Sequence, residues 1–214
     1  MKIMKRVPMI LLLGILLAGC TGIPVRSAVK PDMSVPVGNI DGSHFMGVRY
    51  PFKVSAPPNW TVTTEYPKFM ADLGFEEEGL KESQLFIFNP ATQSNLQIDF
   101  TPAGRYSRFN QRTIEWITTA AAGSFKEELE KEFGKGAQAV ISPTEPCSLK
   151  GVPYAAKGVA TYYRKEMKIE HGWVYAFAEP YQIFIIYMVL EREGTDDHQD
   201  IKTILDSFEV VPKQ

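Results

Sequence analysis

The segment Tyr181-Gln182-Ile183-Phe184-Ile185-Ile186-Tyr187-Met188-Val189-Leu190, near the C-terminus, is almost entirely apolar and indicates the fold of the chain. A strand with one wet face alternates apolar and polar residues, whereas this segment presents apolar side chains on both of its sides. It is too short to cross a membrane, because a spanning helix needs about 20 apolar residues. We therefore expect the central strand of a sheet that has helices packed on both faces.

The two segments before it, residues 154–163 and 168–178, are also predicted strands. The turns that join the three segments are very short, and short turns connect only antiparallel neighbours. Upstream, residues 85–88 and 96–101 form another predicted strand pair, and the second of these alternates apolar with polar side chains. The sheet is therefore expected to be antiparallel. Shorter strands are predicted at residues 45–50, 52–56, 60–64, 137–141 and 208–211.

Two helices are predicted from apolar residues at spacings of three and four. The first follows Ser107 as its N-cap and ends before Gly134 and Gly136. The second follows Thr195 as its N-cap. With the sheet, these helices predict an α+β fold, namely an α/β/α sandwich with a central antiparallel sheet. The apolar stripes contain Ile114, Ile117, Ala121, Phe125 and Leu129 in the first helix and Ile201, Ile204, Leu205 and Phe208 in the second.

The N-terminus has the three parts of a secretory signal peptide. The basic residues Lys2, Lys5 and Arg6 precede a short apolar stretch, which ends in Leu17-Ala18-Gly19-Cys20. This ending is similar to a bacterial lipobox, which implies cleavage before Cys20 and attachment of lipid to its thiol. We predict a lipoprotein signal peptide in residues 1–19 and incorporation of palmitate at Cys20.

Two other interpretations of the N-terminus explain its sequence less well. An uncleaved membrane anchor conflicts with the apolar stretch at residues 7–18, which is too short and is interrupted by Pro8 and Gly14. A plain secretory signal peptide would leave Cys20 unmodified. The lipoprotein interpretation predicts a stable membrane anchor, since two or more acyl chains suffice for one. Because Thr21 rather than Asp follows Cys20, the outer membrane facing the periplasm is favoured, if the organism has one.

Residues 20–43 are rich in glycine and proline and contain no aromatic residue, which predicts a flexible tether. We place a single domain after it, in residues 44–214. Removal of residues 1–19 changes the formal charge from −2 to −5, because that segment carries three basic residues and no acidic one. An acidic chain is a poor binder of nucleic acid, so we expect no nucleic-acid partner. Acylation of Cys20 would leave Cys147 as the one free thiol, which excludes an intramolecular disulfide.

The order of these elements resembles the PsbP-like family. Three features carry the resemblance: residues 50–60, where a strand enters a proline-rich turn closed by Trp60; a central helix after a strand pair; and residues 201–208, where a helix runs into a final strand. The resemblance spans about residues 45–211 and implies an α/β/α sandwich. It also implies a role as an extrinsic subunit, assembly factor or binding protein, and the DcrB-like bacterial branch consists of envelope lipoproteins. No functional residue carries over from it.

No sequence motif for catalysis or metal binding is present. The histidines His44, His171 and His198 lie far apart, and neither a His-Glu-x-x-His nor a Cys-x-x-Cys motif occurs. Acidic residues such as Asp99 and Glu170 are scattered along the chain. We therefore expect no catalytic residue, no metal and no cofactor. His171 is interpreted either as a pH-sensitive contact or, more simply, as a strand residue on a partly wet face.

The candidate binding surface consists of aromatic residues on neighbouring predicted strands, namely Trp173, Tyr175, Tyr181 and Tyr187. Tyrosine and tryptophan are favoured where a protein grips a partner or an apolar ligand. A core beneath a helix would use the same residues. The sequence thus predicts a non-catalytic, membrane-anchored envelope lipoprotein that binds or helps to assemble an envelope protein partner. The alternative is an enzyme facing the periplasm, or a binder of a small apolar ligand, whose site the sequence does not reveal.

Overall fold

The computed structural model describes residues 30–73, 83–103, 109–133, 139–164 and 166–211. The predicted signal peptide, Cys20 and the first part of the predicted tether lie outside the described residues, as do Ser107, Gly134 and Gly136. No helix in these described ranges has the length and apolar character needed to cross a membrane.

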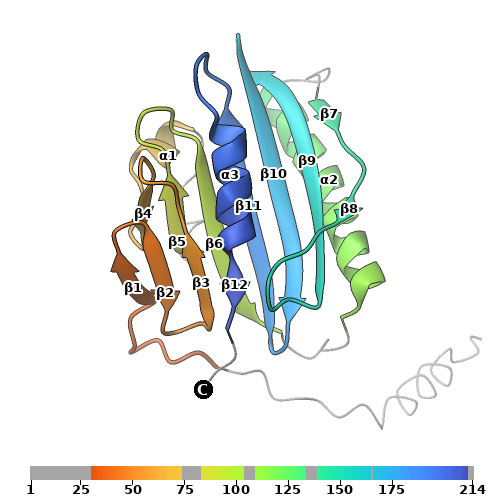
Figure 1. Ribbon diagram of the computed structural model, residues 1–214. Coiled ribbons are helices and arrows are strands. Elements are labelled where there is room, and N and C mark those ends of the chain that lie inside the picture. The colour runs from red at the N-terminus through yellow and green to blue at the C-terminus, as the bar shows by residue number, and fades with distance from the viewer. Residues whose placement is uncertain (1–29, 74–82, 104–108, 134–138, 165, 212–214) are drawn as a thin grey trace, which may run out of the picture.

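A large antiparallel sheet forms the centre of the molecule (Figure 1). β11 lies in its middle, between β6 and β10, and its residues on one side are all buried. The prediction of a central strand is therefore confirmed. The order across the sheet is β4 (Thr61–Thr63), β5 (Ser83–Phe88), β6 (Asn95–Pro102), β11 (Tyr181–Leu190), β10 (Met167–Ala178), β9 (Tyr154–Arg164) and β7 (Ala139–Ile141), and β8 (Glu145–Pro146) also pairs with β9.

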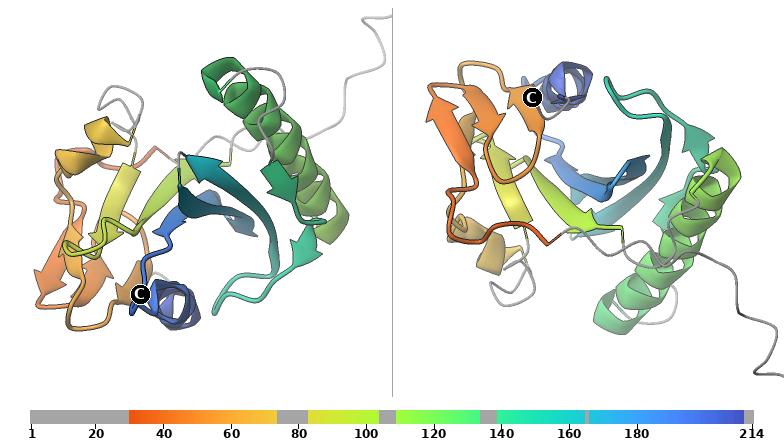
Figure 2. Two further views of the ribbon diagram at one scale, coloured as in Figure 1. Left: turned by 90° about the horizontal axis from the view of Figure 1, so that it is seen from above. Right: turned by 90° about the horizontal axis from the view of Figure 1, so that it is seen from below.

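The two longer helices cover opposite faces of this sheet (Figure 2). Helix α2 (Gln111–Phe133) packs on β9 and β10. Helix α3 (Asp197–Ser207) packs on β11 and on the small sheet described next. The third helix, α1 (Phe69–Asp72), is a single turn. The predicted α+β fold with helices on both faces of an antiparallel sheet is confirmed.

Both predicted N-caps are wrong by one or more residues. Helix α2 begins at Gln111, and the side-chain oxygen of Asn110 accepts a hydrogen bond from the backbone amide of Thr113 at 2.9 Å. This is the geometry of an N-cap. At α3 the N-cap is Asp196, whose side chain makes no capping bond, while the Thr195 hydroxyl donates to the Arg192 carbonyl at 2.9 Å.

A second, smaller sheet lies beside α3 on the same face of the large sheet (Figure 1). Its strands are, in order, β1 (Gly38–Asp41), β2 (His44–Gly47), β3 (Phe52–Ser55) and β12 (Glu209–Val210). The C-terminal strand β12 thus pairs with a strand from the beginning of the domain. The sequence predicts strands near β2, β3 and β12 but no separate sheet.

The predicted boundary between tether and domain at residues 43 and 44 is wrong. Residues 38–41 form strand β1, which pairs with β2 through a turn at Gly42, and Gly42 has a positive φ of 57°. Gly38 lies against Phe45, whose ring would be 2.4 Å from an added Cβ. Gly38 and Gly42, which suggested a tether, therefore serve a close packing contact and a tight turn. The domain begins before residue 38.

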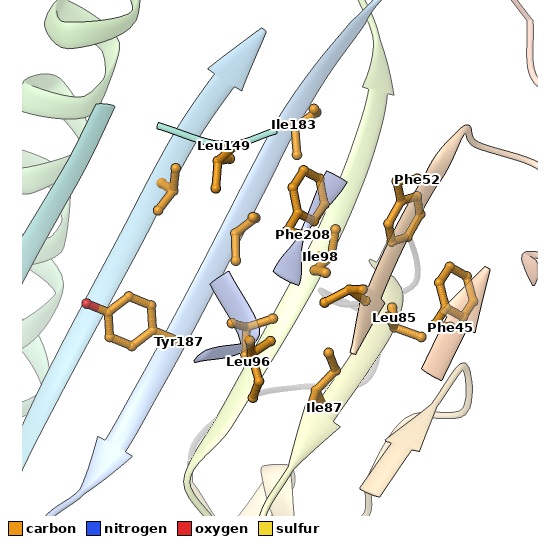
Figure 3. Packing of buried hydrophobic residues seen from close by; sticks show 14 of the residues in the cluster. Phe45, Phe52, Leu85, Ile87, Leu96, Ile98, Leu149, Ile183, Tyr187 and Phe208 are labelled. Atoms are coloured by element: carbon orange, nitrogen blue, oxygen red, sulfur yellow. The ribbon is translucent and has the colours of Figure 1, made fainter. Parts of the chain in front are cut away.

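The main core lies between the large sheet and the layer formed by α3 and the small sheet (Figure 3). The rings of Phe52 and Phe100 stack with their centroids 4.6 Å apart, and Phe208 stacks on Phe52 at 5.8 Å. Such aromatic pairs add about 0.5–1.5 kcal/mol to the effect of burial. They join the two sheets and α3 into one core.

Candidate binding site

The four aromatic residues predicted as a binding surface do not form one. Trp173 and Tyr175 lie on the α2 side of the large sheet, whereas Tyr181 and Tyr187 lie on the α3 side. Trp173 is only 3% exposed, and its indole nitrogen donates to the Thr118 carbonyl of α2 at 3.1 Å. Tyr181 and Tyr187 are also buried, and Tyr175 is half-buried. The prediction of a shared surface is wrong, and the core alternative holds for the three buried residues.

Tyr187 nevertheless leads to a group of polar side chains. Its ring reaches from β11 across β10 (Figure 3), where Gly172 leaves room for it: a Cβ at Gly172 would lie 2.0 Å from the ring. The Tyr187 hydroxyl donates to a carboxylate oxygen of Glu170 at 3.3 Å. Burial, together with the charge of Glu170, raises the pKa of Tyr187. The tyrosine therefore remains a protonated donor near neutral pH.

His198, on the first turn of α3, lies between two carboxylates. Its ring nitrogens are 3.6 Å from Glu170 Oε1 and 3.3 Å from Glu191 Oε1. Glu191 also accepts a hydrogen bond from Lys168 Nζ at 2.7 Å. This bond lowers the pKa of the Glu191 carboxyl and raises the pKa of the Lys168 amine. We call Lys168, Glu170, Tyr187, Glu191 and His198 the α3 cluster.

A pocket of about 410 Å³ opens beside the α3 cluster, where β11 leads into α3. Asp197, the first residue of the helix, lines it and is only 2% exposed. Asp197 Oδ1 accepts a hydrogen bond from Asn89 Nδ2 at 2.9 Å, whereas Oδ2 has no hydrogen-bond partner among the described residues. The remaining lining residues are Val189, Glu191, Arg192, Glu193, Thr195 and His198.

Neither a protein-family model nor a curated protein matches this chain, but solved structures do. A cyanobacterial PsbP (CyanoP) from Synechocystis matches with a TM-score of 0.52 and 10% identity, over 86% of this chain and 98% of that one. LpqN of Mycobacterium tuberculosis, described as involved in cell envelope biogenesis, matches with a TM-score of 0.50 and 13% identity, over 83% of this chain and 90% of that one. The chain has a PsbP-like fold.

The PsbP-like fold is also similar to part of a larger protein. A structure from Bacteroides thetaiotaomicron matches with a TM-score of 0.50 and 8% identity, over 81% of this chain and 50% of that one. The chain thus spans half the length of that protein. At these identities the likeness establishes the architecture, which agrees with the family resemblance inferred from the sequence.

Sequence reasoning missed the α3 cluster because its members are scattered along the chain. The β10–β11 hairpin brings them together, since Ala178 lies opposite Tyr181 and Glu170 consequently lies opposite Val189. The Glu191 backbone amide continues the ladder by donating to the Lys168 carbonyl at 3.1 Å. Counting back from the short turn at residues 179–180, which the sequence did reveal, would have placed Lys168 beside Glu191. Nothing in the sequence places α3 over this pair.

Two further groups that could react, the His171 imidazole and the Cys147 thiol, have pKa values shifted by burial. His171 is almost fully buried, its ring lies 4.6 Å from that of Phe125, and desolvation lowers its pKa to about 4. Burial raises the pKa of Cys147 to about 11, so its nucleophilic thiolate form is scarce near neutral pH. Across the described ranges, no three His, Cys, Asp or Glu side chains approach closely enough to hold a metal ion. The α3 cluster and its pocket are suited to binding a polar group.

Proposed function

We propose that this chain is a non-catalytic, lipid-anchored protein of the bacterial cell envelope that binds or helps to assemble another envelope component. The observation that carries the proposal is the sequence Leu17-Ala18-Gly19-Cys20 after a basic start and a short apolar stretch. Acyl chains on Cys20 would hold the domain at a membrane surface. Thr21 favours the outer membrane, with the domain facing the periplasm, in an organism that has an outer membrane.

The fold supports a binding role. LpqN, which has the same architecture, is described as involved in cell envelope biogenesis. In this chain the groups that would be nucleophiles, Cys147 and Tyr187, have pKa values raised by burial. The α3 cluster and its pocket, by contrast, offer charged groups at the surface beside a rigid sheet. These features suit recognition of a partner better than bond-making chemistry.

The start of the domain limits how far it can stand from the membrane. The Arg49 guanidinium donates to the Val35 carbonyl at 2.9 Å, and the backbone amides of Val48 and Arg49 donate to the Val37 carbonyl. Residues from Val35 onward therefore belong to the domain. The 15 steps along the backbone from Cys20 to Val35 would span about 50 Å even if fully extended. The point where the tether enters the domain would therefore lie within about 50 Å of the bilayer surface.

Metabolic labelling with radioactive palmitate tests the anchor. Wild-type protein should take up label and fractionate with membranes, whereas Cys20→Ser should do neither. Cys147→Ser is the matched control, since it removes the chain's other cysteine and should label like wild type. Equal labelling of wild type and Cys20→Ser would refute lipidation at Cys20.

Crosslinking in intact cells, followed by mass spectrometry, tests the partner. We expect one or a few envelope proteins to be recovered with the wild type, and far less of them with the Cys20→Ser variant, which lacks the anchor. Recovery of no envelope protein from the intact envelope would contradict the assembly role.

A further inference from the structure

We propose that a second copy of this chain docks on the outward face of helix α2, with the two helices antiparallel. This face consists of Arg112, Trp116, Ala120, Gly123 and Glu127, which are all exposed and recur at spacings of three and four. The inference goes beyond the proposed function, because it concerns how many copies of the chain act together. It does not depend on lipidation of the N-terminus.

Trp116 is the first sign that the outward face contacts another surface. Helix α2 packs its inner side on β9 and β10, and Figure 2 shows the helix at the outside of the molecule. Trp116 lies on the other side of the helix and is 71% exposed. Burial of a large aromatic ring is favourable, and tryptophan is enriched at the centres of protein interfaces. The outward face therefore gains stability when a second surface covers the indole.

Gly123 is the second sign. It lies two turns beyond Trp116 on the same face, because seven residues bring a helix back to nearly the same direction. A Cβ added at Gly123 would meet no atom within 4 Å, so packing inside the chain does not require a glycine there. A glycine inside a helix is less favourable than an alanine. Together with the exposed Ala120, Gly123 leaves room for a large ring beside the helix.

An antiparallel pair of α2 helices brings the indole and this space together. In a symmetric dimer the same surface of both copies forms the contact, so every contact occurs twice. With the two-fold axis between residues 119 and 120, Trp116 of each copy lies opposite Gly123 of the other. Each indole then fills the space beside a glycine, and small residues at the contact let the two helices approach closely.

The charges on the outward face favour this arrangement. Arg112 lies one turn before Trp116, and Glu127 lies one turn after Gly123. In the antiparallel pair, Arg112 of each copy faces Glu127 of the other, whereas a parallel pair in register would oppose like charges. Complementary charges determine the register and orientation of an interface. The outward face is therefore complementary to itself in charge as well as in shape.

The contact between two helices is small, so the dimer is expected to be weak. Standard interfaces bury about 1,200–2,000 Å², and a single helix pair buries less, so we expect a Kd on the order of 100 µM. At about 5 µM the chain would be roughly 90% monomeric. The proposed lipid anchors would hold two chains at a higher effective concentration on one membrane.

Sedimentation equilibrium of the full chain, in a detergent matched to the density of the solvent, tests the proposal. We expect wild type to dimerise as its concentration rises through about 100 µM, and Trp116→Ala to dimerise about tenfold more weakly. Gly123→Gln should weaken dimerisation about fivefold, because its side chain occupies the place of the indole. Tyr163→Ala is the matched control: it removes a ring that is 63% exposed on β9, and it should dimerise like wild type.

Reversal of the charges tests the antiparallel register. Arg112→Glu and Glu127→Arg should each dimerise about fivefold more weakly than wild type at low salt, since each variant alone opposes like charges. An equimolar mixture of the two variants should recover the dimer, because each acidic position then faces a basic one. Both positions are exposed, so both variants are expected to fold.

Three results would overturn the proposal. The first is a wild-type chain that stays monomeric up to about 1 mM. The second is a dimer that Trp116→Ala leaves unchanged. The third is a mixture of the two charge variants that dimerises no better than either variant alone.

Discussion

The two sides of strand β10 differ sharply, although they are built from adjacent residues. His171 points under α2, where it is almost fully buried against Phe125 and its pKa is lowered to about 4. Glu170, its neighbour, points to the other side and lies 3.6 Å from His198 and 3.3 Å from the Tyr187 hydroxyl. Thus α2 excludes water from its side, whereas the start of α3 leaves charged groups at the surface.

The difference shows that adjacent residues of one strand can serve different purposes, one in a buried contact and the next in a solvated group of charges. Under α2, a histidine is kept neutral and a tryptophan packs without access to solvent, so these two contacts contribute mainly to the free energy of unfolding. On the α3 side, the ion pairs of the α3 cluster are partly solvated and contribute little to stability. Those groups are free to interact with a ligand. The following predictions test this division, beginning with the largest effect.

Removing the indole beneath α2 should be the most damaging change. Trp173→Ala is expected to lower the free energy of unfolding by about 3–5 kcal/mol, because it deletes a buried aromatic ring and leaves a cavity. Trp116→Ala is the matched control in α2 itself, since Trp116 is 71% exposed, and it should change stability by less than about 0.5 kcal/mol. Denaturation by guanidinium, monitored by circular dichroism, measures both. Similar losses for the two variants would contradict the division.

Burial of His171 should also make the free energy of unfolding decrease in acid. Burial lowers the pKa of His171 from 6.5 to about 4. Between these pH values the His171 ring is protonated in the unfolded chain but neutral in the folded chain. Stability due to this group is complete above pH 6.5 and falls by about 3 kcal/mol as the pH drops to 4. The difference in stability between wild type and His171→Leu, measured across this range, isolates the effect. A difference that does not change with pH would contradict it.

A side chain at position 172 should disturb the packing of the Tyr187 ring, which lies over Gly172. Gly172→Ala places a Cβ against the Tyr187 ring, and we expect a loss of about 1–3 kcal/mol from overpacking. Tyr187→Leu should relieve part of this loss in the double variant, which a double-mutant cycle would report. Gly123→Ala in α2 meets no neighbouring atom and should stabilise by about 0.5–1 kcal/mol. Strictly additive effects of the Gly172 and Tyr187 substitutions would show that the contact is unimportant.

The smallest effect on stability is expected for an ion pair of the α3 cluster. Lys168→Met removes the partly exposed ion pair with Glu191, and such solvated pairs contribute little to stability, so we expect only a small fall in the melting temperature. This fall should disappear in 1 M salt, since screening weakens exposed charges. Thermal unfolding at low and high salt measures it. A large fall that persists in salt would place the α3 cluster with the core.

The sequence predicts the large sheet well because its signals are local. The apolar pattern of residues 181–190 and the short turns on either side of residues 168–178 determine three central strands and their antiparallel order. Composition misled at β1, because glycines that serve a turn and a close contact resemble those of a linker. It also misled at Trp173 and Tyr187, since the aromatic residues of a core and of a binding face are alike. The pocket around Asp197 depends on how α3 docks onto the sheet, and periodicity carries no information about docking.

The pairing of β12 with β3 has a consequence for the timing of folding. Glu209 and Val210 complete the small sheet against Lys53 and Phe52, and the backbone amides of Val210 and Val211 donate to Lys150 and Pro51 at 2.9 Å. Contacts so distant in sequence form slowly, and these cannot form before the ribosome has added residues 209–211. The small sheet therefore stays incomplete until β12 has been made. For a protein proposed to carry a signal peptide, that delay would favour export before the domain has folded.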